Sequence, residues 1–206
     1  MKKTQLFWLL VFLLSAGTVV SCSESDDEEA YEYANWQSRN DAFFATLEDS
    51  LSRGGSVWKK IKAYTKDETT PGVNTDYIYI KVLKNGADGP SPLYSDSVRV
   101  AYRGRLIPSA TYSEGYVFDQ TYVGDYNPKT TAVSDNLASG FITGFTTALL
   151  HMKRNDSWRV YIPYQLGYNT TENGSVPAYS VLIFDLSLID FVSGTGSFTP
   201  WSSRRQ

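Results

Sequence analysis

The sequence predicts an α+β protein, and three observations support this class. Several short segments alternate apolar and polar residues, as antiparallel strands do, and residues typical of turns separate them. Apolar residues recur at helical spacing in an N-terminal stretch and in one short segment late in the chain. The 206 residues are 42% hydrophobic and 15% aromatic, which is enough for a substantial core and indicates one main domain.

Residues 1–21 are predicted to be a signal peptide. Lys2 and Lys3 precede an apolar run from Leu6 to Leu14 that is too short to span a membrane. The following Val-Val-Ser-Cys resembles a bacterial lipobox, in which the cysteine, here Cys22, is lipidated. We therefore expect a lipoprotein of the bacterial cell envelope, anchored by lipid in the outer membrane. An ordinary cleaved signal peptide is the alternative.

Residues 22–33 are predicted to be an acidic tether. The stretch 23–32 holds six acidic and no basic side chains, which is typical of a solvated, disordered segment. It also resembles the acidic export signal of surface lipoproteins in Bacteroidetes. The membrane face, either the periplasm or the cell surface, stays open at this point.

A helical N-terminal arm is predicted over 34–66. Its apolar residues up to position 51 share one helical stripe: Trp36, Phe43, Phe44, Leu47 and Leu51. Gly54 and Gly55 are expected to end this helix. Residues 58–64 are predicted to form a second short helix.

A β-rich domain is predicted over 67–192, with a C-terminal tail over 193–206. Its strands are expected at 77–84, 98–106, 116–120, 157–163 and 180–191. The spacing of Ile142, Phe145, Leu149 and Met152 predicts a short amphipathic helix over 143–152. The polar segment 121–139 shows no clear period and is expected to be a loop.

The composition excludes several classes of function. A single Cys and a single His rule out a Cys-rich or multi-His metal site, and a net charge of −3 argues against a nucleic-acid binder. His151 stands at the end of the expected helix, where a histidine typically interacts with the helix dipole. The chain carries no G-x-S-x-G, P-loop or H-E-x-x-H motif. We expect no metal, no cofactor and no nucleic-acid partner.

The first half of the β-rich domain resembles the FKBP-type peptidyl-prolyl isomerases. Residues 98–107 read Val-Arg-Val-Ala-Tyr-Arg-Gly-Arg-Leu-Ile, and residues 117–119 read Val-Phe-Asp. Together they are similar to the family's opening pattern V-x-V-x-Y-x-G-x-L followed by F-D.

The second half resembles the same family in the same order. Residues 141–145 are similar to its V-I-x-G-W, and residues 148–152 to its helix ending in Met. Residues 158–163 and 166–168 resemble the next strand and the A-Y-G bend, while 176–177 and 182–188 resemble I-P-P and L-x-F-x-V-x-L. The core of the resemblance covers 98–191 and is closest to the macrophage-infectivity-potentiator branch of secreted bacterial isomerases.

Three positions depart from the family pattern. Phe145 stands where the family has a Trp, and Asn169 stands where it has a Gly after the bend tyrosine. The loop before Ile142 is longer, and Val133 is the nearest counterpart of an aromatic residue expected near its end. The first departure keeps an aromatic platform but removes an N–H group and some area.

The resemblance implies a bent antiparallel sheet wrapped around the short helix, with a proline pocket between them and the helical arm outside. Phe145 is expected to be the pocket floor, and the implied catalytic residues are Tyr102, Phe118, Asp119, Phe145 and Tyr168. The implied substrate-binding residues are Phe141, Ile142, Val176 and Phe184. The Ile142 backbone N–H and the Tyr168 hydroxyl are expected to meet substrate carbonyls. Asp119 is expected either to accept a hydrogen bond from Tyr102 or to approach the same substrate carbonyl as Tyr168.

The implied activity is isomerisation of Xaa-Pro bonds in exported, proline-containing polypeptides, with macrolides as candidate inhibitors. Rotation about a prolyl bond crosses a barrier of about 18–20 kcal/mol, and a dry aromatic pocket disfavours the polar planar amide. Such chemistry needs neither nucleophile nor metal. Two alternatives stay open: a non-catalytic FKBP-fold chaperone, and a protein- or glycan-binding surface lipoprotein that uses the loop 121–139. The short arm favours a monomer.

Overall fold

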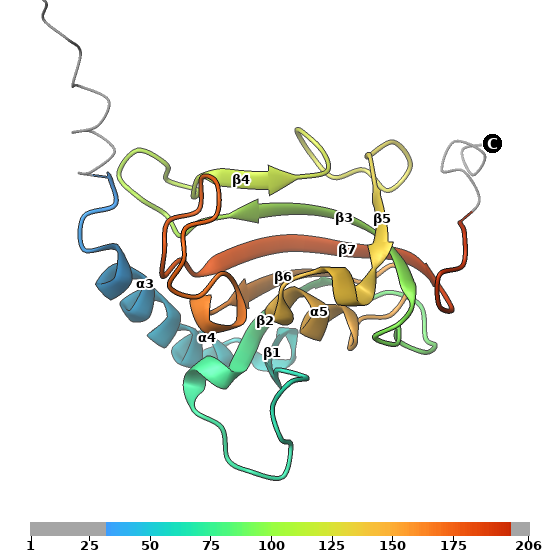
Figure 1. Ribbon diagram of the computed structural model, residues 1–206, viewed down its shortest axis with the longest axis horizontal. Coiled ribbons are helices and arrows are strands. Elements are labelled where there is room, and N and C mark those ends of the chain that lie inside the picture. Colours follow the sequence, from blue (N-terminus) through green and yellow to red (C-terminus); the bar gives the residue numbers. More distant parts are fainter. Residues whose placement is uncertain (1–31, 199–206) are drawn as a thin grey trace, which may run out of the picture. The chain divides into compact units, whose positions relative to one another are not determined.

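The computed structural model describes residues 32–198, which build an antiparallel sheet and three α-helices (Figure 1). The predicted signal peptide, Cys22 and residues 199–206 lie outside the described residues. The strands are β1 (Trp58–Lys62), β2 (Tyr77–Lys84), β3 (Ser97–Arg105), β4 (Val117–Gln120), β5 (Ser134–Leu137), β6 (Ser157–Ile162) and β7 (Leu182–Val192). The helices are α3 (Trp36–Ala45), α4 (Leu47–Arg53) and α5 (Thr143–Leu149). This arrangement confirms the predicted fold class and a helical arm before the sheet.

The strand order is β1-β2-β6-β7-β3-β4, and β5 also pairs with β3. The long strand β3 shares its outer edge between two partners, because residues 97–100 pair with β5 and residues 103–105 pair with β4. Its other edge pairs along nearly its whole length with β7. The segment between β4 and β5 therefore leaves the sheet and returns to the same edge.

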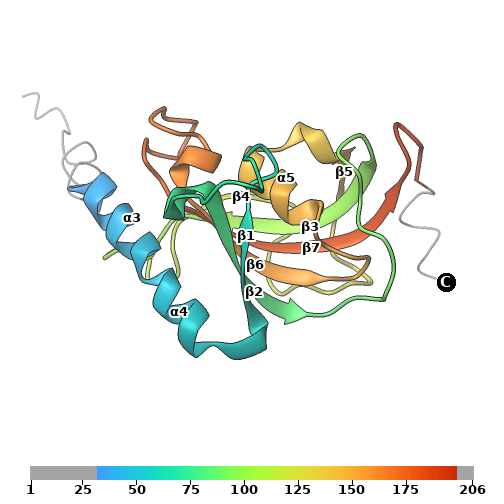
Figure 2. The same cartoon turned by 90° about the horizontal axis from the view of Figure 1, so that it is seen from below.

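Helices α5 and α3 lie on opposite faces of the sheet (Figure 2). Ile162 of β6 touches α5, where a Cβ added to Gly144 would lie 2.3 Å from the Ile162 Cγ2 atom. Tyr161 is next to Ile162 and points to the other face, as side chains of a strand alternate. There it faces Phe43 of α3, with ring centroids 6.3 Å apart, and Trp58 of β1 stacks on it at 5.5 Å.

Both layers contribute to the buried core. The largest side chains buried on the sheet and α5 include Ile78, Ile80, Val98, Leu149, Met152, Leu182, Leu186 and Leu188. Tyr79 is also fully buried, because Phe44 of α3 packs edge-on against its ring at 5.3 Å. The helical arm thus covers apolar surface that the sheet alone would expose.

Two predicted elements differ from the structure. Residues 58–62 form strand β1 and pair with β2, so the expected second helix over 58–64 is wrong, and the end of the segment 34–66 joins the sheet. A segment this short is compatible with both helical and strand periodicity, and its pairing with β2 makes it a strand. The expected loop 121–139 contains strand β5, whose polar residues show no strand pattern.

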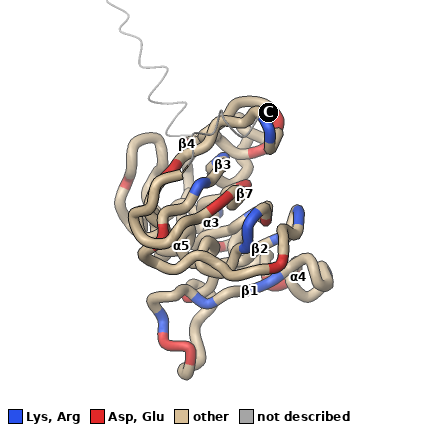
Figure 3. Tube along the Cα trace, turned by 90° about the vertical axis from the view of Figure 1, so that its right-hand side faces the viewer, with Lys and Arg blue, Asp and Glu red and all other residues tan. Residues whose placement is uncertain are grey.

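Residues of opposite charge lie close together along β3 and β7, as the blue and red segments of the backbone tube show (Figure 3). Asp185 of β7 forms ion pairs with Arg105 of β3 and with Arg159 of β6, the latter at 2.6 Å. Along their strands, these three charged residues alternate with buried apolar residues on the α5 side. The ion pairs therefore lie on the face of the sheet opposite α5. Among residues 32–198, no helix is both long and apolar enough to cross a membrane.

Candidate functional site

An aromatic cluster occupies the space between α5 and the strands β3 and β7. The Phe145 ring stacks on Phe141, with centroids 4.4 Å apart and an angle of 20° between the planes. The rings of Tyr102 and Phe184 meet Phe145 edge-on at 5.5 and 5.0 Å. The structure thus gathers the predicted floor and three other predicted site residues into one cluster.

The sequence around α5 fixes the position of Phe145. The Thr146 hydroxyl donates a hydrogen bond of 2.8 Å to the Ala138 carbonyl, which ties the helix to the segment before it. Gly144 lets the helix approach Ile162 of β6 more closely than any side chain would allow. Phe145 is consequently only 2% exposed, and the stacked Phe141 ring covers one of its faces.

Gly104 is required for the second wall of the cluster. A Cβ at this position would lie 2.6 Å from the Phe184 ring and 2.7 Å from the Phe118 ring. Because Gly104 has no Cβ atom, Phe118 of β4 can meet Phe184 of β7 edge-on across β3, with ring centroids 5.5 Å apart. The sequence motif contains this glycine but does not indicate its packing role.

A polar group lies at the edge of the cluster. The Tyr102 hydroxyl donates a hydrogen bond of 2.8 Å to the Asp119 carboxylate, which is exposed to solvent. Burial, and secondarily the neighbouring Asp119, raises the pKa of Tyr102 above its ordinary value. Burial also raises the pKa of Tyr168, with the Asp119 charge as the second cause. Both hydroxyls therefore keep their protons at neutral pH and can donate hydrogen bonds.

Tyr168 and Val176 lie on the loop between β6 and β7, which we call the 168–181 loop. Asn169 adopts a left-handed backbone conformation with φ of 61°, which asparagine tolerates better than most residues. This explains why an asparagine can replace the glycine of the family pattern. Val176 is 3% exposed and exchanges backbone hydrogen bonds of 3.0 Å with Asn173.

Ile142 immediately precedes α5 in an extended conformation, with φ of −59° and ψ of 153°. Its carbonyl accepts a hydrogen bond of 3.0 Å from the Thr146 N–H. Within residues 32–198, no hydrogen bond uses the Ile142 N–H as a donor. This N–H is therefore available for a ligand carbonyl.

Two other features lie away from the cluster. The exposed His151 faces the Thr147 carbonyl through Nδ1 at 2.9 Å, consistent with its place at the helix end. In the described part of the chain, no group of three or more His, Cys, Asp or Glu residues could hold a metal ion.

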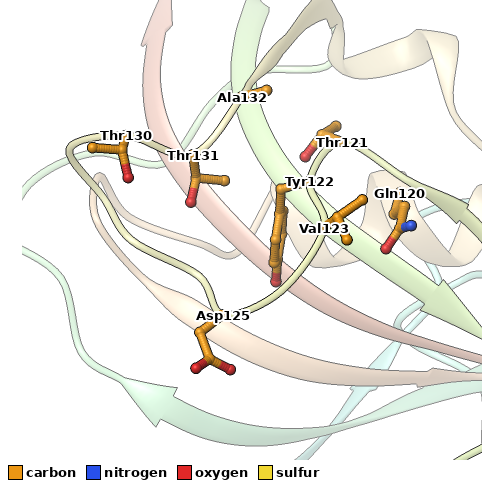
Figure 4. A pocket seen from close by; sticks show the side chains of 8 residues that line it. All are labelled: Gln120, Thr121, Tyr122, Val123, Asp125, Thr130, Thr131 and Ala132. Atoms are coloured by element: carbon orange, nitrogen blue, oxygen red, sulfur yellow. The ribbon is translucent and has the colours of Figure 1, made fainter.

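A separate hollow of about 470 Å³ lies in the segment after β4 (Figure 4). Its lining is mostly polar: Gln120, Thr121, Tyr122, Val123, Asp125, Thr130, Thr131 and Ala132. Gln120 accepts a hydrogen bond of 3.0 Å from Arg103, which alternates with Tyr102 and Gly104 along β3. The hollow is therefore on the other side of β3 from the aromatic cluster, and none of the predicted site residues lines it.

Known proteins resemble this chain in sequence. Residues 89–189 match the family described as FKBP-type peptidyl-prolyl cis-trans isomerase. The macrophage infectivity potentiator of Trypanosoma cruzi is 28% identical over 195 residues, which is 94% of this chain and 88% of that protein. The peptidyl-prolyl cis-trans isomerase Mip of Coxiella burnetii is 35% identical over 135 residues. That match covers 64% of this chain, and it spans about half of the relative, 53% of its length.

Two solved structures share the fold. FkpA from Escherichia coli superposes with a TM-score of 0.57 at 20% identity, covering 95% of this chain and 84% of that one. A peptidyl-prolyl cis-trans isomerase from Pseudomonas syringae pv. tomato gives a TM-score of 0.54 at 22% identity, covering 77% and 95%. At these identities the structural likeness establishes the fold.

Proposed function

We infer, from the membership of residues 89–189 in the FKBP-type peptidyl-prolyl isomerase family, that the protein accelerates cis-trans rotation about Xaa-Pro bonds. The observation that carries this proposal is the aromatic cluster around Phe145, with the Tyr102–Asp119 hydrogen bond at its edge. Isomerases of this family act on proline-containing peptides. The substrates are accordingly proline-containing polypeptides, and the exported proteins of the envelope are the proposed physiological set.

The physics of the reaction suits this arrangement. The planar prolyl amide is stabilised by resonance, and the twisted transition state has lost that resonance and its charge separation. Apolar rings around the bond disfavour the polar planar form relative to the twisted one. Hydrogen bonds from the Ile142 N–H and the Tyr168 hydroxyl would hold the flanking carbonyls. A 10⁵-fold acceleration corresponds to about 7 kcal/mol, which several such effects can supply together.

Phe141 must move for a proline ring to rest on the face of Phe145 that it now covers. The two rings are parallel to within 20°, and Phe145 is only 2% exposed. A rotation of the Phe141 side chain exchanges a ring-on-ring contact of about 0.5–1.5 kcal/mol for a contact with substrate. Phe141 thus acts as a movable wall of the proposed pocket.

The assay for this function is isomerisation of a prolyl tetrapeptide, followed with a coupled protease and the full chain. We expect catalysis above the spontaneous rate, and inhibition by a macrolide that mimics proline. Macrolide binding without turnover would favour the non-catalytic chaperone. If the protein shows neither turnover nor macrolide binding but binds glycans or folded proteins, a surface lipoprotein that uses the hollow after β4 would be favoured.

The proposed location is the bacterial outer membrane, with the lipid on Cys22 as the anchor and the chain acting as a monomer. Support comes from the lipobox-like sequence before Cys22 and the acidic residues after it. Acyl chains contribute about 0.8 kcal/mol per buried CH₂ group, so removing them should release the protein. We expect the Cys22→Ala variant protein to be released from the membrane fraction. Membrane partitioning equal to wild type would contradict the lipid anchor.

A further inference from the structure

Helix α3 reaches across to the end of the 168–181 loop, far from it in sequence. The Trp36 indole N–H donates a hydrogen bond of 2.8 Å to the Ser180 hydroxyl. One helical turn later, the Asn40 side-chain oxygen accepts a hydrogen bond of 2.8 Å from the Val181 N–H. The helix thereby holds both residues at the point where the loop enters β7.

The first of these contacts continues into the loop itself. The Ser180 hydroxyl donates its own proton to the Pro177 carbonyl at 2.6 Å. Because the hydroxyl donates to Pro177, its lone pairs are free to accept from Trp36, so the two bonds fix its orientation. Pro177 directly follows Val176, which is a predicted wall of the proline pocket. A chain of two hydrogen bonds therefore leads from α3 to Pro177, the neighbour of the predicted wall residue Val176.

The second contact is oriented by the helix. The Asn40 amide N–H donates to the Trp36 carbonyl at 2.7 Å, which leaves the side-chain oxygen turned toward Val181. Asn40 is fully buried, and Ser180 and Trp36 are 3% and 6% exposed. Water cannot easily replace either bond, so each buried group depends on its partner in α3.

Within the loop, Asn173 and Val176 exchange two backbone hydrogen bonds of 3.0 Å, which join residues in its middle. One backbone hydrogen bond of 3.0 Å, from the Tyr179 N–H to the Asn169 carbonyl, closes its base. Both residues have positive φ values, 63° for Tyr179 and 61° for Asn169. Asparagine tolerates this conformation, whereas it is costly for Tyr179. A base held in such a conformation needs support from its surroundings, and α3 provides it at the adjacent Ser180 and Val181.

We propose that Trp36 and Asn40 are positioning residues that hold the 168–181 loop, and with it Tyr168 and Val176, in the geometry required for prolyl isomerisation. This inference rests on the proposed function. It makes the N-terminal helix a working part of the isomerase site, although neither residue touches the substrate. From its sequence, this helix is expected to pack outside the isomerase body, as an arm.

The test compares three α3 variants of the full chain. Trp36→Phe removes the indole N–H and keeps an aromatic ring, and Asn40→Ala removes the acceptor for Val181. Gln37→Ala is the matched control, because Gln37 is exposed on the same helix. We expect the first two to lower kcat/KM about fivefold each, the value of one neutral hydrogen bond, and the control to leave it unchanged.

Two further measurements separate positioning from general destabilisation. Hydrogen exchange should become faster in residues 170–178 and stay unchanged in β6. In a Tyr168→Phe background, the Asn40 substitution should reduce kcat/KM by a smaller factor than in wild type, because part of its effect passes through the Tyr168 hydroxyl. Ser180→Thr keeps the hydroxyl and should retain more activity than Ser180→Ala.

The outcomes distinguish this inference from the proposed function. An active wild type whose α3 variants keep normal kcat/KM and loop exchange would overturn the positioning role. Equal activity losses in the wild-type and Tyr168→Phe backgrounds would also overturn it. An inactive wild type would reject the isomerase proposal. The exchange data would then decide separately whether α3 holds the loop.

Discussion

At the scale of single residues, Phe141 and Phe145 fit each other as a pair. The family pattern quoted above has a small residue at the first position and a Trp at the second. This chain has a larger residue at the first and a smaller ring at the second, which keeps the total volume similar. The stacking of the two rings at 4.4 Å follows from this exchange. A consequence is that the platform is covered when no substrate is bound.

Phe141→Val should therefore uncover Phe145. We expect the KM for a prolyl peptide to fall several-fold, because substrate no longer displaces a stacked ring of about 0.5–1.5 kcal/mol. The turnover number should change little. Steady-state kinetics measures both values, and thermal unfolding controls for the loss of buried surface. An unchanged or higher KM would show that Phe141 does not restrict the platform.

Tyr168→Phe tests the proposed hydrogen bond to substrate. Removing a neutral hydrogen bond of about 1 kcal/mol should lower kcat/KM about fivefold and leave the fold intact. Tyr164→Phe is the matched control, since Tyr164 lies near the same loop and packs edge-on against Tyr179 at 5.3 Å. Equal kcat/KM values for the two variants would show that the Tyr168 hydroxyl makes no hydrogen bond to substrate.

At the scale of elements, periodicity predicted strands β2, β3, β4, β6 and β7 and helix α5, because each carries apolar residues at a clear spacing. Strand β1 was missed because Trp58 and Ile61 fit a helix as well as a strand, and only pairing with β2 settles the choice. Strand β5 was missed because three of its four residues are polar and its pairing with β3 is non-local.

The motif order predicted that Tyr102, Phe118, Phe141, Phe145 and Phe184 would lie together, but it did not predict how their rings pack. Nothing in the local sequence indicates that Phe141 stacks on Phe145, or that Asn40 is buried against Val181. Both contacts depend on side-chain packing between elements that are separate in the chain. Gly104 gave a partial signal, since a glycine inside a strand indicates close approach of its neighbours.

The contact of α5 with β6 gives a prediction at this scale. Gly→Ala in a helix ordinarily stabilises it by about 1 kcal/mol. At Gly144 the added Cβ would lie 2.3 Å from Ile162 Cγ2, so overpacking of roughly 1–3 kcal/mol should prevail and lower the free energy of unfolding. Urea unfolding of Gly144→Ala measures the sign directly.

A double variant checks that this contact is the cause. Ile162→Ala removes the Cγ atoms that the new methyl group would meet. The double variant Gly144→Ala/Ile162→Ala should lose less stability than the sum of the two single variants. If the losses of unfolding free energy are additive, the steric strain of Gly144→Ala arises from a contact other than the one with Ile162.

At the scale of the whole molecule, aromatic residues hold the layers together, and many of them are tyrosines. Burial raises the pKa of seven tyrosines among the described residues: Tyr64, Tyr79, Tyr102, Tyr122, Tyr126, Tyr161 and Tyr168. For each of them burial is the largest cause, since it disfavours the charged phenolate. The fold as a whole is therefore sensitive to alkaline pH.

The sign of this dependence follows from proton linkage. Tyrosines of the unfolded chain ionise near pH 10, whereas those buried in the folded protein keep their protons to higher pH. The folded state thus binds more protons above about pH 10, and its stability should fall as the pH rises, by up to about 1.4 kcal/mol per pH unit for each such tyrosine. Below about pH 10 this contribution to stability is fully present.

Urea unfolding from about pH 8 to about pH 11 measures this loss, and tyrosinate absorbance reports the ionisation. Lysine side chains in general also lose their charge toward the upper end of this range, so a single-residue variant is needed to isolate the tyrosines. Tyr79→Phe isolates the tyrosine contribution, because Tyr79 is fully buried between α3 and the sheet. The stability of this variant should fall less steeply above about pH 10 than that of wild type. Parallel curves for the two proteins would mean that Tyr79 ionises equally in the folded and unfolded states, contrary to its burial beneath the N-terminal helix.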